Sequence, residues 1–317
     1  MEFIEVHNGE ISLNVAIAGE GPLILCVHGW PELWYSWRHQ IEYFAAQGYR
    51  VAALDVRGYG GSSKPHEISA YTLKNLGADV AAVGRHLSDE PVILLGHDWG
   101  APTAYTTALL YPDQFRAVGL LSVPFVPITE HSFYDLFAAN YEGKFFYQKY
   151  FQAEGVAEAE LEADVATALR KVYYSISGDA TDRAFLADKP EDAGLLDGMV
   201  DPQPMPGWMS EADLQVYAEA FSQGGFRGPI NRYRAQRQDP AELSHLAGQL
   251  LPQPSCFIGG ERDPVRYFIP GNDLYADPGR TCKDCRLVDI IPGAGHWVQQ
   301  EAPDQTNQKL AEFFAML

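Results

Sequence analysis

Short apolar runs alternate with helical stretches along most of the chain, and this pattern predicts a layered α/β fold. Several of the runs are apolar throughout, as is typical of strands in a sheet that helices cover on both faces. The strands predicted from these runs are Ile11–Ala18, Leu23–Val27, Val51–Asp55, Val92–Leu95, Ala117–Val123, Ser255–Gly259 and Arg286–Ile291. Helical stretches between such strands indicate a doubly wound α/β arrangement.

The alternation stops between about Pro127 and His245, where the chain becomes rich in aromatic and charged residues. Apolar positions there follow helical periodicity over Val156–Tyr174 and Ser210–Gln223. The segment Gly178–Pro206 holds several prolines and aspartates and is predicted to be an irregular surface excursion. We therefore predict a helical cap inserted into the core. The predicted domains are a first core part at residues 1–126, the cap at residues 127–245 and a second core part at residues 246–317.

Composition narrows the class of protein. The chain has 317 residues, of which 46% are hydrophobic, enough for one large core or for a core with an insertion. The net charge of -19 at pH 7 argues against nucleic acid or an anionic membrane surface as a partner. No apolar run reaches the roughly 18 residues that span a bilayer, and the acidic N-terminal segment lacks the plan of a signal peptide. We therefore expect a cytoplasmic protein without membrane insertion.

The four cysteines are too few for a disulfide framework. Cys26 and Cys256 lie in apolar, strand-like runs, where a free thiol packs as a small hydrophobe. Cys282 and Cys285 have the spacing of a redox motif or of half a zinc site, but the sequence has no second pair of this kind. We expect neither a metal site nor a functional role for this pair.

The segment Gly96-His97-Asp98-Trp99-Gly100 follows a predicted strand and precedes an apolar, helix-like stretch. It resembles the nucleophile elbow of α/β-hydrolases, a sharp turn whose glycines allow close backbone packing while the central side chain stands exposed. Here that side chain is an aspartate, where a serine is usual. A carboxylate is already ionised at neutral pH and can displace a leaving group from a tetrahedral carbon, which gives a covalent alkyl ester. Asp98 is therefore the predicted nucleophile.

Two later segments supply the partners that hydrolysis of such an ester needs. Asp263 and His296 each follow a predicted strand, and the order nucleophile, acid, histidine is that of α/β-hydrolases. Asp263 is predicted to hold the His296 ring and stabilise its cation, while His296 takes a proton from the water that attacks the ester. Glu261 is the nearby rival to Asp263 for the role of the acid.

The loop His28-Gly29-Trp30-Pro31 follows another predicted strand and faces the elbow in this type of fold. The backbone N–H groups of Trp30 and Trp99 are predicted to converge on the ester oxygen that becomes an oxyanion. His28 is expected to brace the loop, and His97 is expected to pack beneath the elbow. The remaining histidines show no partner pattern and are treated as structural or exposed: His7, His39, His66, His86, His131 and His245.

Several motifs together resemble the soluble epoxide hydrolases of the α/β-hydrolase superfamily, and the resemblance spans almost the whole chain. These motifs are His28–Arg38, Asp55–Ser63, Gly96–Gly100 and Gly295–Trp297. The resemblance is to the hydrolase domain alone, as in bacterial and plant relatives. It implies a mostly parallel, eight-stranded sheet flanked by helices and an inserted all-helical cap. It also implies hydration of an epoxide to a vicinal diol, without a metal or organic cofactor.

Two segments of the predicted cap, Phe145–Gln152 and Gly225–Arg234, are similar to the family segments that carry its two acid tyrosines. On that resemblance the tyrosines are Tyr147 and Tyr233, and Tyr150 is the nearest competitor. Opening an epoxide leaves an alkoxide, which departs poorly unless it is protonated as the bond breaks. A phenol with a pKa of about 10 can donate this proton and is still protonated at neutral pH.

The predicted substrate contacts are Trp30, Pro31, Trp99, Gln148 and Trp297. Trp30 stands where the family commonly has phenylalanine, and it is expected to narrow the pocket floor while its backbone donor is kept. A second departure is Arg232, which stands where many relatives have a tryptophan. This cation either contacts the core, favours polar substrates or is merely solvated.

Two other functions stay open at this point. A haloalkane or haloacid dehalogenase shares the aspartate elbow and the triad, but a halide needs no proton and haloalkane dehalogenases lack the paired cap tyrosines. A haloacid enzyme would use arginines at the pocket, for which Arg232 and Arg234 are available. A non-catalytic ligand-binding protein would have a broken triad or a missing acid. We therefore predict an enzyme that acts on a small-molecule epoxide and water, as a monomer or a homodimer.

Overall fold

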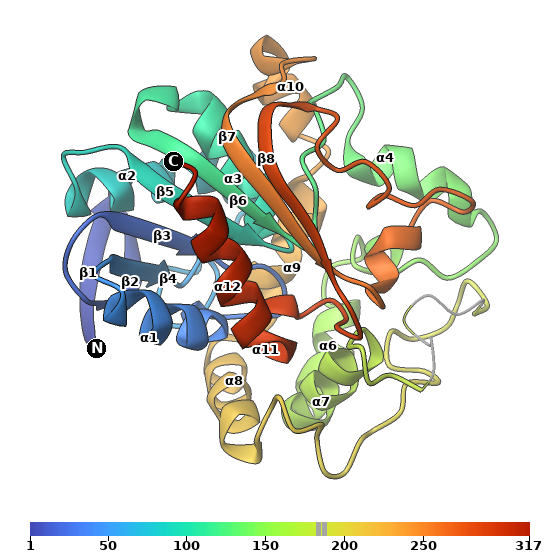
Figure 1. The fold of residues 1–317 in the computed structure, drawn as a ribbon. Coiled ribbons are helices and arrows are strands. Elements are labelled where there is room, and N and C mark those ends of the chain that lie inside the picture. The colour runs from blue at the N-terminus through green and yellow to red at the C-terminus, as the bar shows by residue number, and fades with distance from the viewer. Residues whose placement is uncertain (182–184, 186–188) are drawn as a thin grey trace.

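The computed structural model describes residues 1–181, 185 and 189–317, and helices lie on both sides of one sheet (Figure 1). Within these residues the sheet has eight strands in the order β1-β2-β4-β3-β5-β6-β7-β8. The strands are β1 Glu2–Asn8, β2 Ile11–Ala18, β3 Leu23–Val27, β4 Arg50–Leu54, β5 Val92–His97, β6 Phe115–Leu121, β7 Leu251–Gly260 and β8 Cys282–Ile291. Pairing is parallel from β4 to β8 and antiparallel for β1–β2 and β2–β4. The predicted mostly parallel, eight-stranded sheet is confirmed.

The apolar pattern does not predict strand β1, which forms one edge of the sheet. Val6 is its single buried residue, and the other side chains are exposed or half-buried. An edge strand of this kind contains no apolar run, so periodicity alone misses it. Strands β7 and β8 also begin earlier than predicted. Their pairing shifts register in this first stretch, and in β7 the residues Pro252 and Pro254 interrupt the apolar pattern.

Alternate residues of the central strands enter two hydrophobic clusters, one on each face of the sheet. The core helices are α1 Arg38–Ala46, α2 Leu73–Leu87, α3 Gly100–Leu110, α11 Val298–Glu301 and α12 Pro303–Phe314. In β3, Leu25 and Val27 pack in the cluster that includes α2 and α3. Ile24 and Cys26 pack in the cluster that includes α1, α11 and α12. Both faces of the sheet are therefore covered, which explains why its central strands are apolar throughout.

Most of the helices between β6 and β7 lie beyond the carboxyl ends of the parallel strands, whereas α10 Asp239–Glu242 lies near the start of β7 (Figure 1). The others are α4 Phe133–Ala138, α5 Tyr147–Tyr150, α6 Val156–Ala163, α7 Val165–Ser175, α8 Glu211–Gly224 and α9 Arg227–Ala235. The stretch predicted as one helical run over Val156–Tyr174 is two helices. Asp164 separates them, because its side chain accepts a hydrogen bond from the Thr167 amide at 3.1 Å and caps α7.

Six short 3₁₀ helices occur in the described part of the chain: η1 Trp34–Trp37, η2 Ile68–Tyr71, η3 Pro112–Gln114, η4 Ala139–Tyr141, η5 Ser244–Leu246 and η6 Pro264–Tyr267. Within the predicted excursion Gly178–Pro206, residues 182–184 and 186–188 lie outside the described residues. The described remainder of that segment contains no helix and no strand beyond one bridge between Lys144 and Pro190. No helix in the described ranges is both long and apolar enough to cross a bilayer.

Candidate active site

Asp98 lies in a sharp turn between β5 and α3, at the carboxyl end of a central strand. Its φ angle is 50°, a left-handed value that residues other than glycine rarely adopt. A Cβ atom on Gly96 would lie 2.2 Å from the Gly100 carbonyl oxygen, and one on Gly100 would lie 2.0 Å from the Val27 carbonyl oxygen. The strand and the helix can therefore meet at this angle only with glycine at both positions, as the elbow pattern predicts.

His296 lies between Asp98 and Asp263, in the loop that follows β8. Its Nε2 is 3.3 Å from Asp98 Oδ2, and its Nδ1 is 2.9 Å from Asp263 Oδ2. His296 and Asp263 are buried, whereas the Asp98 side chain is 17% exposed and lines a cavity. The rival acid, Glu261, is exposed and accepts a hydrogen bond from the Gly293 amide. The structure thus brings together the three residues that the sequence nominates as a triad.

The charged forms of the triad residues stabilise one another. Burial disfavours the His296 cation, but the carboxylates of Asp263 and Asp98 outweigh burial and raise the pKa of His296 well above its ordinary value. Burial also disfavours the Asp98 carboxylate, yet His296 and the Trp30 amide hold the pKa of Asp98 below its ordinary value. Asp98 is therefore ionised at neutral pH, as a carboxylate nucleophile has to be.

Two further donors hold the Asp263 carboxylate in place. Tyr275 Oη donates to Oδ2 at 2.6 Å, and the Val265 amide donates to Oδ1 at 2.8 Å. With His296 on Oδ2 as well, both carboxylate oxygens have partners. Sequence reasoning missed Tyr275, because it is one of 17 tyrosines and belongs to no motif that marks it.

The loop after β3 directs a backbone donor at the Asp98 carboxylate. The Trp30 amide donates to Asp98 Oδ1 at 2.8 Å. His28 braces this loop as expected, since its Nε2 accepts from the Val56 amide at 3.0 Å. The Trp99 amide is at the first turn of α3, where N–H groups have no partner within the helix. Its part in an oxyanion hole stays a prediction.

His97 packs beneath the elbow as expected and joins two loops of the site. Its Nδ1 is 2.5 Å from Glu32 Oε1, and its Nε2 is 2.7 Å from the His296 carbonyl oxygen. Glu32 also accepts from the Gly29 amide at 3.2 Å and from Gln299 Nε2 at 3.1 Å. Sequence reasoning missed Glu32, because a glutamate after a proline is normally a solvated loop residue. Its buried carboxylate instead ties the Trp30 loop to the elbow and to the His296 loop.

Glu301 holds the main chain on both sides of His296. Its Oε2 accepts from the Gly295 amide at 2.8 Å, and its Oε1 accepts from the Trp297 amide at 2.9 Å. Oε2 also accepts from the Gly178 amide of the α7–α8 connection at 2.7 Å. Burial raises the pKa of Glu301 to about 7. The sequence gives no signal for this residue, since a glutamate at the end of a short helix is usually exposed.

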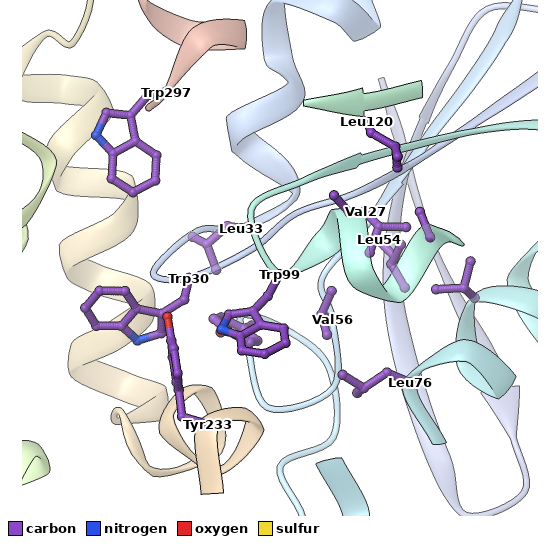
Figure 2. Close-up of a cluster of buried hydrophobic side chains, with 14 of the residues drawn as sticks. Val27, Trp30, Leu33, Leu54, Val56, Leu76, Trp99, Leu120, Tyr233 and Trp297 are labelled. Carbon is purple, nitrogen blue, oxygen red and sulfur yellow. The ribbon is translucent and has the colours of Figure 1, made fainter. Parts of the chain in front are cut away.

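Tyr147 at the start of α5 and Tyr233 in α9 lie together, with ring centroids 5.6 Å apart. Figure 2 shows Tyr233 between the rings of Trp30 and Trp99, at centroid distances of 6.0 and 5.4 Å. Burial raises the pKa of both phenols, and the charge of Asp98 acts in the same direction. Both tyrosines therefore carry their protons at neutral pH. The competitor Tyr150 points elsewhere, because its Oη donates to Glu160 Oε2 at 2.8 Å.

A cavity of about 330 Å³ opens beside Asp98. Its lining includes Asp98, Trp99, Tyr147 and Gln148, and Asn140 is the other polar side chain there. The apolar lining consists of Pro102, Val123, Pro124, Val126, Phe133, Leu136, Phe137, Val265, Phe268, Ile269 and Leu274. Leu136 is 44% exposed and Asn140 is also exposed, so the cavity meets solvent near α4 and η4.

Trp99 and Gln148 thus lie where substrate contacts are predicted, whereas the described lining of this cavity does not include Trp30, Pro31 or Trp297. Trp297 is fully buried, and its Nε1 donates to the Tyr173 carbonyl oxygen at 2.8 Å. Trp30 is 3% exposed and packs against aromatic rings of the cap. Trp30 therefore does not narrow the floor of this cavity as predicted, because its ring packs against Tyr233 instead.

Arg232 contacts the core, which was one of its predicted alternatives. It is 3% exposed, pairs with Asp239, donates to the Tyr71 carbonyl oxygen at 2.5 Å and places its guanidinium carbon 4.8 Å from the centre of the Trp99 ring. Arg234 is also buried and pairs with Glu158 at 2.6 Å. Neither arginine is in the described lining of the cavity, so neither is placed to bind a substrate carboxylate there.

The described residues contain no group of three or more histidine, cysteine, aspartate or glutamate side chains that could hold a metal ion. Cys282 and Cys285 lie in β8, far along the strand from its carboxyl end, where His296 follows. All four cysteines are free.

Comparisons with known proteins agree with this geometry. A family model described as the alpha/beta hydrolase fold matches residues 22–303. Epoxide hydrolase A of Mycobacterium tuberculosis is 37% identical over 320 residues, which cover 98% of this chain and 97% of that protein. The structure of an epoxide hydrolase from an endophytic Streptomyces superposes with a TM-score of 0.90 at 43% identity, over 99% of this chain and 94% of that one. Epoxide hydrolase A from Mycobacterium thermoresistibile also gives a TM-score of 0.90, at 38% identity, over 98% of this chain and 97% of that one.

Proposed function

This chain belongs to the α/β-hydrolase fold family and, within it, to the epoxide hydrolases, and from this premise we propose that it hydrates an apolar epoxide through a covalent ester on Asp98. One observation carries the proposal. An ionised aspartate stands at the elbow, and the buried, protonated Tyr147 lines the same cavity. Tyr233, also buried and protonated, packs against Tyr147 with ring centroids 5.6 Å apart. This combination suits a leaving group that is an alkoxide, because the alkoxide needs both a nucleophile at carbon and a proton at oxygen.

In the first half-reaction, the Asp98 carboxylate attacks an epoxide carbon and the carbon–oxygen bond breaks. The electron pair of that bond goes to the epoxide oxygen, which takes a proton from Tyr147 or Tyr233. The hydrogen bond from the Trp30 amide to Oδ1 holds the carboxylate and leaves Oδ2 for the attack. The product of this step is a hydroxyalkyl ester of Asp98.

In the second half-reaction, His296 takes a proton from water, and the oxygen of that water adds to the ester carbon of Asp98. Ester formation removes the Asp98 charge, which is one of the two carboxylates that raise the pKa of His296. The pKa of His296 then falls, so the ring becomes free to act as a base at the stage that needs one. Asp263 keeps the ring oriented throughout. The oxyanion forms on Oδ1, to which the Trp30 amide already donates. Its collapse breaks the bond between the ester carbon and Oδ2, and the leaving oxygen takes the proton from His296 to complete the diol. The regenerated Asp98 carboxyl returns its proton to His296, and the tyrosine phenolate takes up the proton that His296 released when its pKa fell.

The cavity indicates the kind of epoxide. An apolar cavity of about 150 Å³ holds benzene, and the cavity beside Asp98 has about 330 Å³. Its walls are mainly phenylalanine, leucine, valine, isoleucine and proline side chains. A substrate with an aryl group, or with an alkyl chain of similar bulk, gains hydrophobic free energy from burial in this space.

The reaction type is tested by incubating the purified protein with aryl and alkyl epoxides, short haloalkanes and fluoroacetate, and measuring diol and halide release together. We expect diol from the apolar epoxides and no halide. Halide without diol would mean that the enzyme is a dehalogenase and that the two tyrosines serve only packing. Saturable binding of the epoxides without any turnover would favour a non-catalytic protein.

A further inference from the structure

The side-chain amide of Gln148 lies between Tyr147 and Gln236. Its Nε2 is 2.9 Å from Tyr147 Oη, and its Oε1 is 3.0 Å from Gln236 Nε2. Gln148 is 4% exposed and Gln236 is 1% exposed, so these contacts are shielded from competition by bulk water. The three side chains form a short hydrogen-bonded chain that ends at one of the two proposed acids.

The surroundings of Gln236 fix the direction of this chain. Gln236 Nε2 also donates to the Tyr233 carbonyl oxygen at 2.9 Å. Because a carbonyl oxygen can only accept, the Gln236 atom that faces it has to be the NH₂ group. Gln148 consequently turns its oxygen toward Gln236 and its own NH₂ group toward Tyr147. The Tyr147 oxygen is therefore an acceptor here, and its proton is left to be donated elsewhere.

We propose that Gln236 and Gln148 form a relay that keeps the Tyr147 O–H directed at the epoxide oxygen, a role that rests on the proposed function of Tyr147 as an acid. When the epoxide bond breaks, its electron pair goes to oxygen and the Tyr147 proton follows. The phenolate that is left accepts the Gln148 N–H. With the opposite orientation of the Gln148 amide, its oxygen would accept the Tyr147 proton and withdraw it from the substrate.

The hydrogen bond from Gln148 also makes it easier for Tyr147 to lose its proton. Burial raises the pKa of its phenol, and the hydrogen bond from Gln148 opposes that rise. A donor to the phenol oxygen stabilises the phenolate more than the phenol, since hydrogen bonds to a charged acceptor are the stronger ones. The relay thus both aims the proton and eases its departure.

Two neighbouring glutamines allow the relay to be separated from packing. Gln236 is absent from the described lining of the cavity at Asp98, so its effect on the reaction has to pass through other residues. Gln152 also donates to the Tyr233 carbonyl oxygen, at 3.2 Å, and to the Gln148 main-chain oxygen, at 2.8 Å. It has no hydrogen bond to the Gln148 side chain, within the contacts of the described residues. Gln236→Leu and Gln152→Leu therefore both lose a donor to Tyr233, but only the first breaks the relay.

The test measures single-turnover rates of ester formation and of ester hydrolysis for Gln148→Leu, Gln236→Leu and Gln152→Leu, each alone and combined with Tyr147→Phe. We expect Gln148→Leu and Gln236→Leu to slow ester formation about tenfold or more, the size of one hydrogen bond to a developing charge. Ester hydrolysis should stay within about twofold of wild type, and the slowing should disappear in the Tyr147→Phe background, as expected for residues that act through one group. Gln152→Leu should leave both rates close to those of wild type.

Unchanged ester formation in Gln236→Leu would overturn the relay. So would an equal slowing in the presence and absence of the Tyr147 hydroxyl, or an equal slowing by Gln152→Leu, because a packing defect affects all of these proteins alike. Failure of the proposed function itself looks different in the same experiment. Wild-type protein would then hydrate epoxides without forming an ester on Asp98, or Tyr147→Phe would form the ester at the wild-type rate.

Discussion

The Asp98→Asn protein is expected to form no measurable diol, a loss of at least about 10⁴-fold, as is usual when the nucleophile of a covalent mechanism is removed. Asparagine is neutral and cannot form the ester, yet it has nearly the same size. It also tolerates the left-handed backbone conformation, which Asp98 adopts with a φ of 50°. Its side-chain oxygen can still accept the Trp30 amide, which now binds Oδ1. Diol formation is followed by chromatography, and the melting temperature is measured in parallel.

Glu261→Gln is the matched control for this substitution. Glu261 is an exposed carboxylate in the loop that also carries Asp263, and it binds the Gly293 amide rather than His296. We expect this control to keep wild-type turnover. If Asp98→Asn retained more than about 1% of wild-type turnover while its fold was intact, a mechanism in which water attacks the epoxide directly would replace the ester mechanism.

The Tyr147→Phe/Tyr233→Phe protein is expected to lose ester formation by about 10²- to 10⁴-fold, the usual contribution of a general acid. Phenylalanine keeps the ring of each residue. The contact between the two rings, whose centroids are 5.6 Å apart, should therefore remain. Without either hydroxyl, the epoxide oxygen has to leave as an unprotonated alkoxide. The rate of ester formation is measured by rapid mixing, with tryptophan fluorescence as the signal, since Trp99 lines the cavity.

Tyr150→Phe serves as the control for the tyrosine pair, because the Tyr150 hydroxyl donates to Glu160 and does not point into the cavity. It should form the ester at the wild-type rate. Each single variant of Tyr147 or Tyr233 should keep part of the rate, because one phenol is left. Wild-type ester formation in the double variant would show that other groups, or water, protonate the epoxide.

The elbow and the triad could be predicted from the sequence because their geometry follows from strand ends. Asp98, Asp263 and His296 each follow a parallel strand, and the carboxyl ends of parallel strands lie at the same edge of a sheet. Apolar runs also predicted every strand that is covered by helices. The edge strand β1 and the break between α6 and α7 were missed, because one depends on backbone pairing and the other on a single capping residue, Asp164.

Buried polar partners could not be predicted from the sequence. Glu32, Gln236 and Glu301 are residues of types that normally lie in solvent, and each becomes a hydrogen-bond partner only when distant segments meet. Glu32 and Gln236 are buried, and Glu301 is half-buried. Arg232 shows the same limit, since its side chain could have bound substrate, core or water. Its pairing with Asp239 and its contact with Trp99 depend on how helix α9 packs on the core.

The covalent ester is the central claim, and the mass of the peptide that contains Asp98 tests it most directly. The His296→Gln protein, which lacks the base for ester hydrolysis, is mixed with an apolar epoxide, digested and analysed by mass spectrometry. A covalent ester predicts a gain equal to the full mass of the epoxide on Asp98, because the addition loses no atoms, and no gain when Asp98→Asn is combined with His296→Gln. Diol production by His296→Gln without any adduct, or an adduct on another residue, would contradict it.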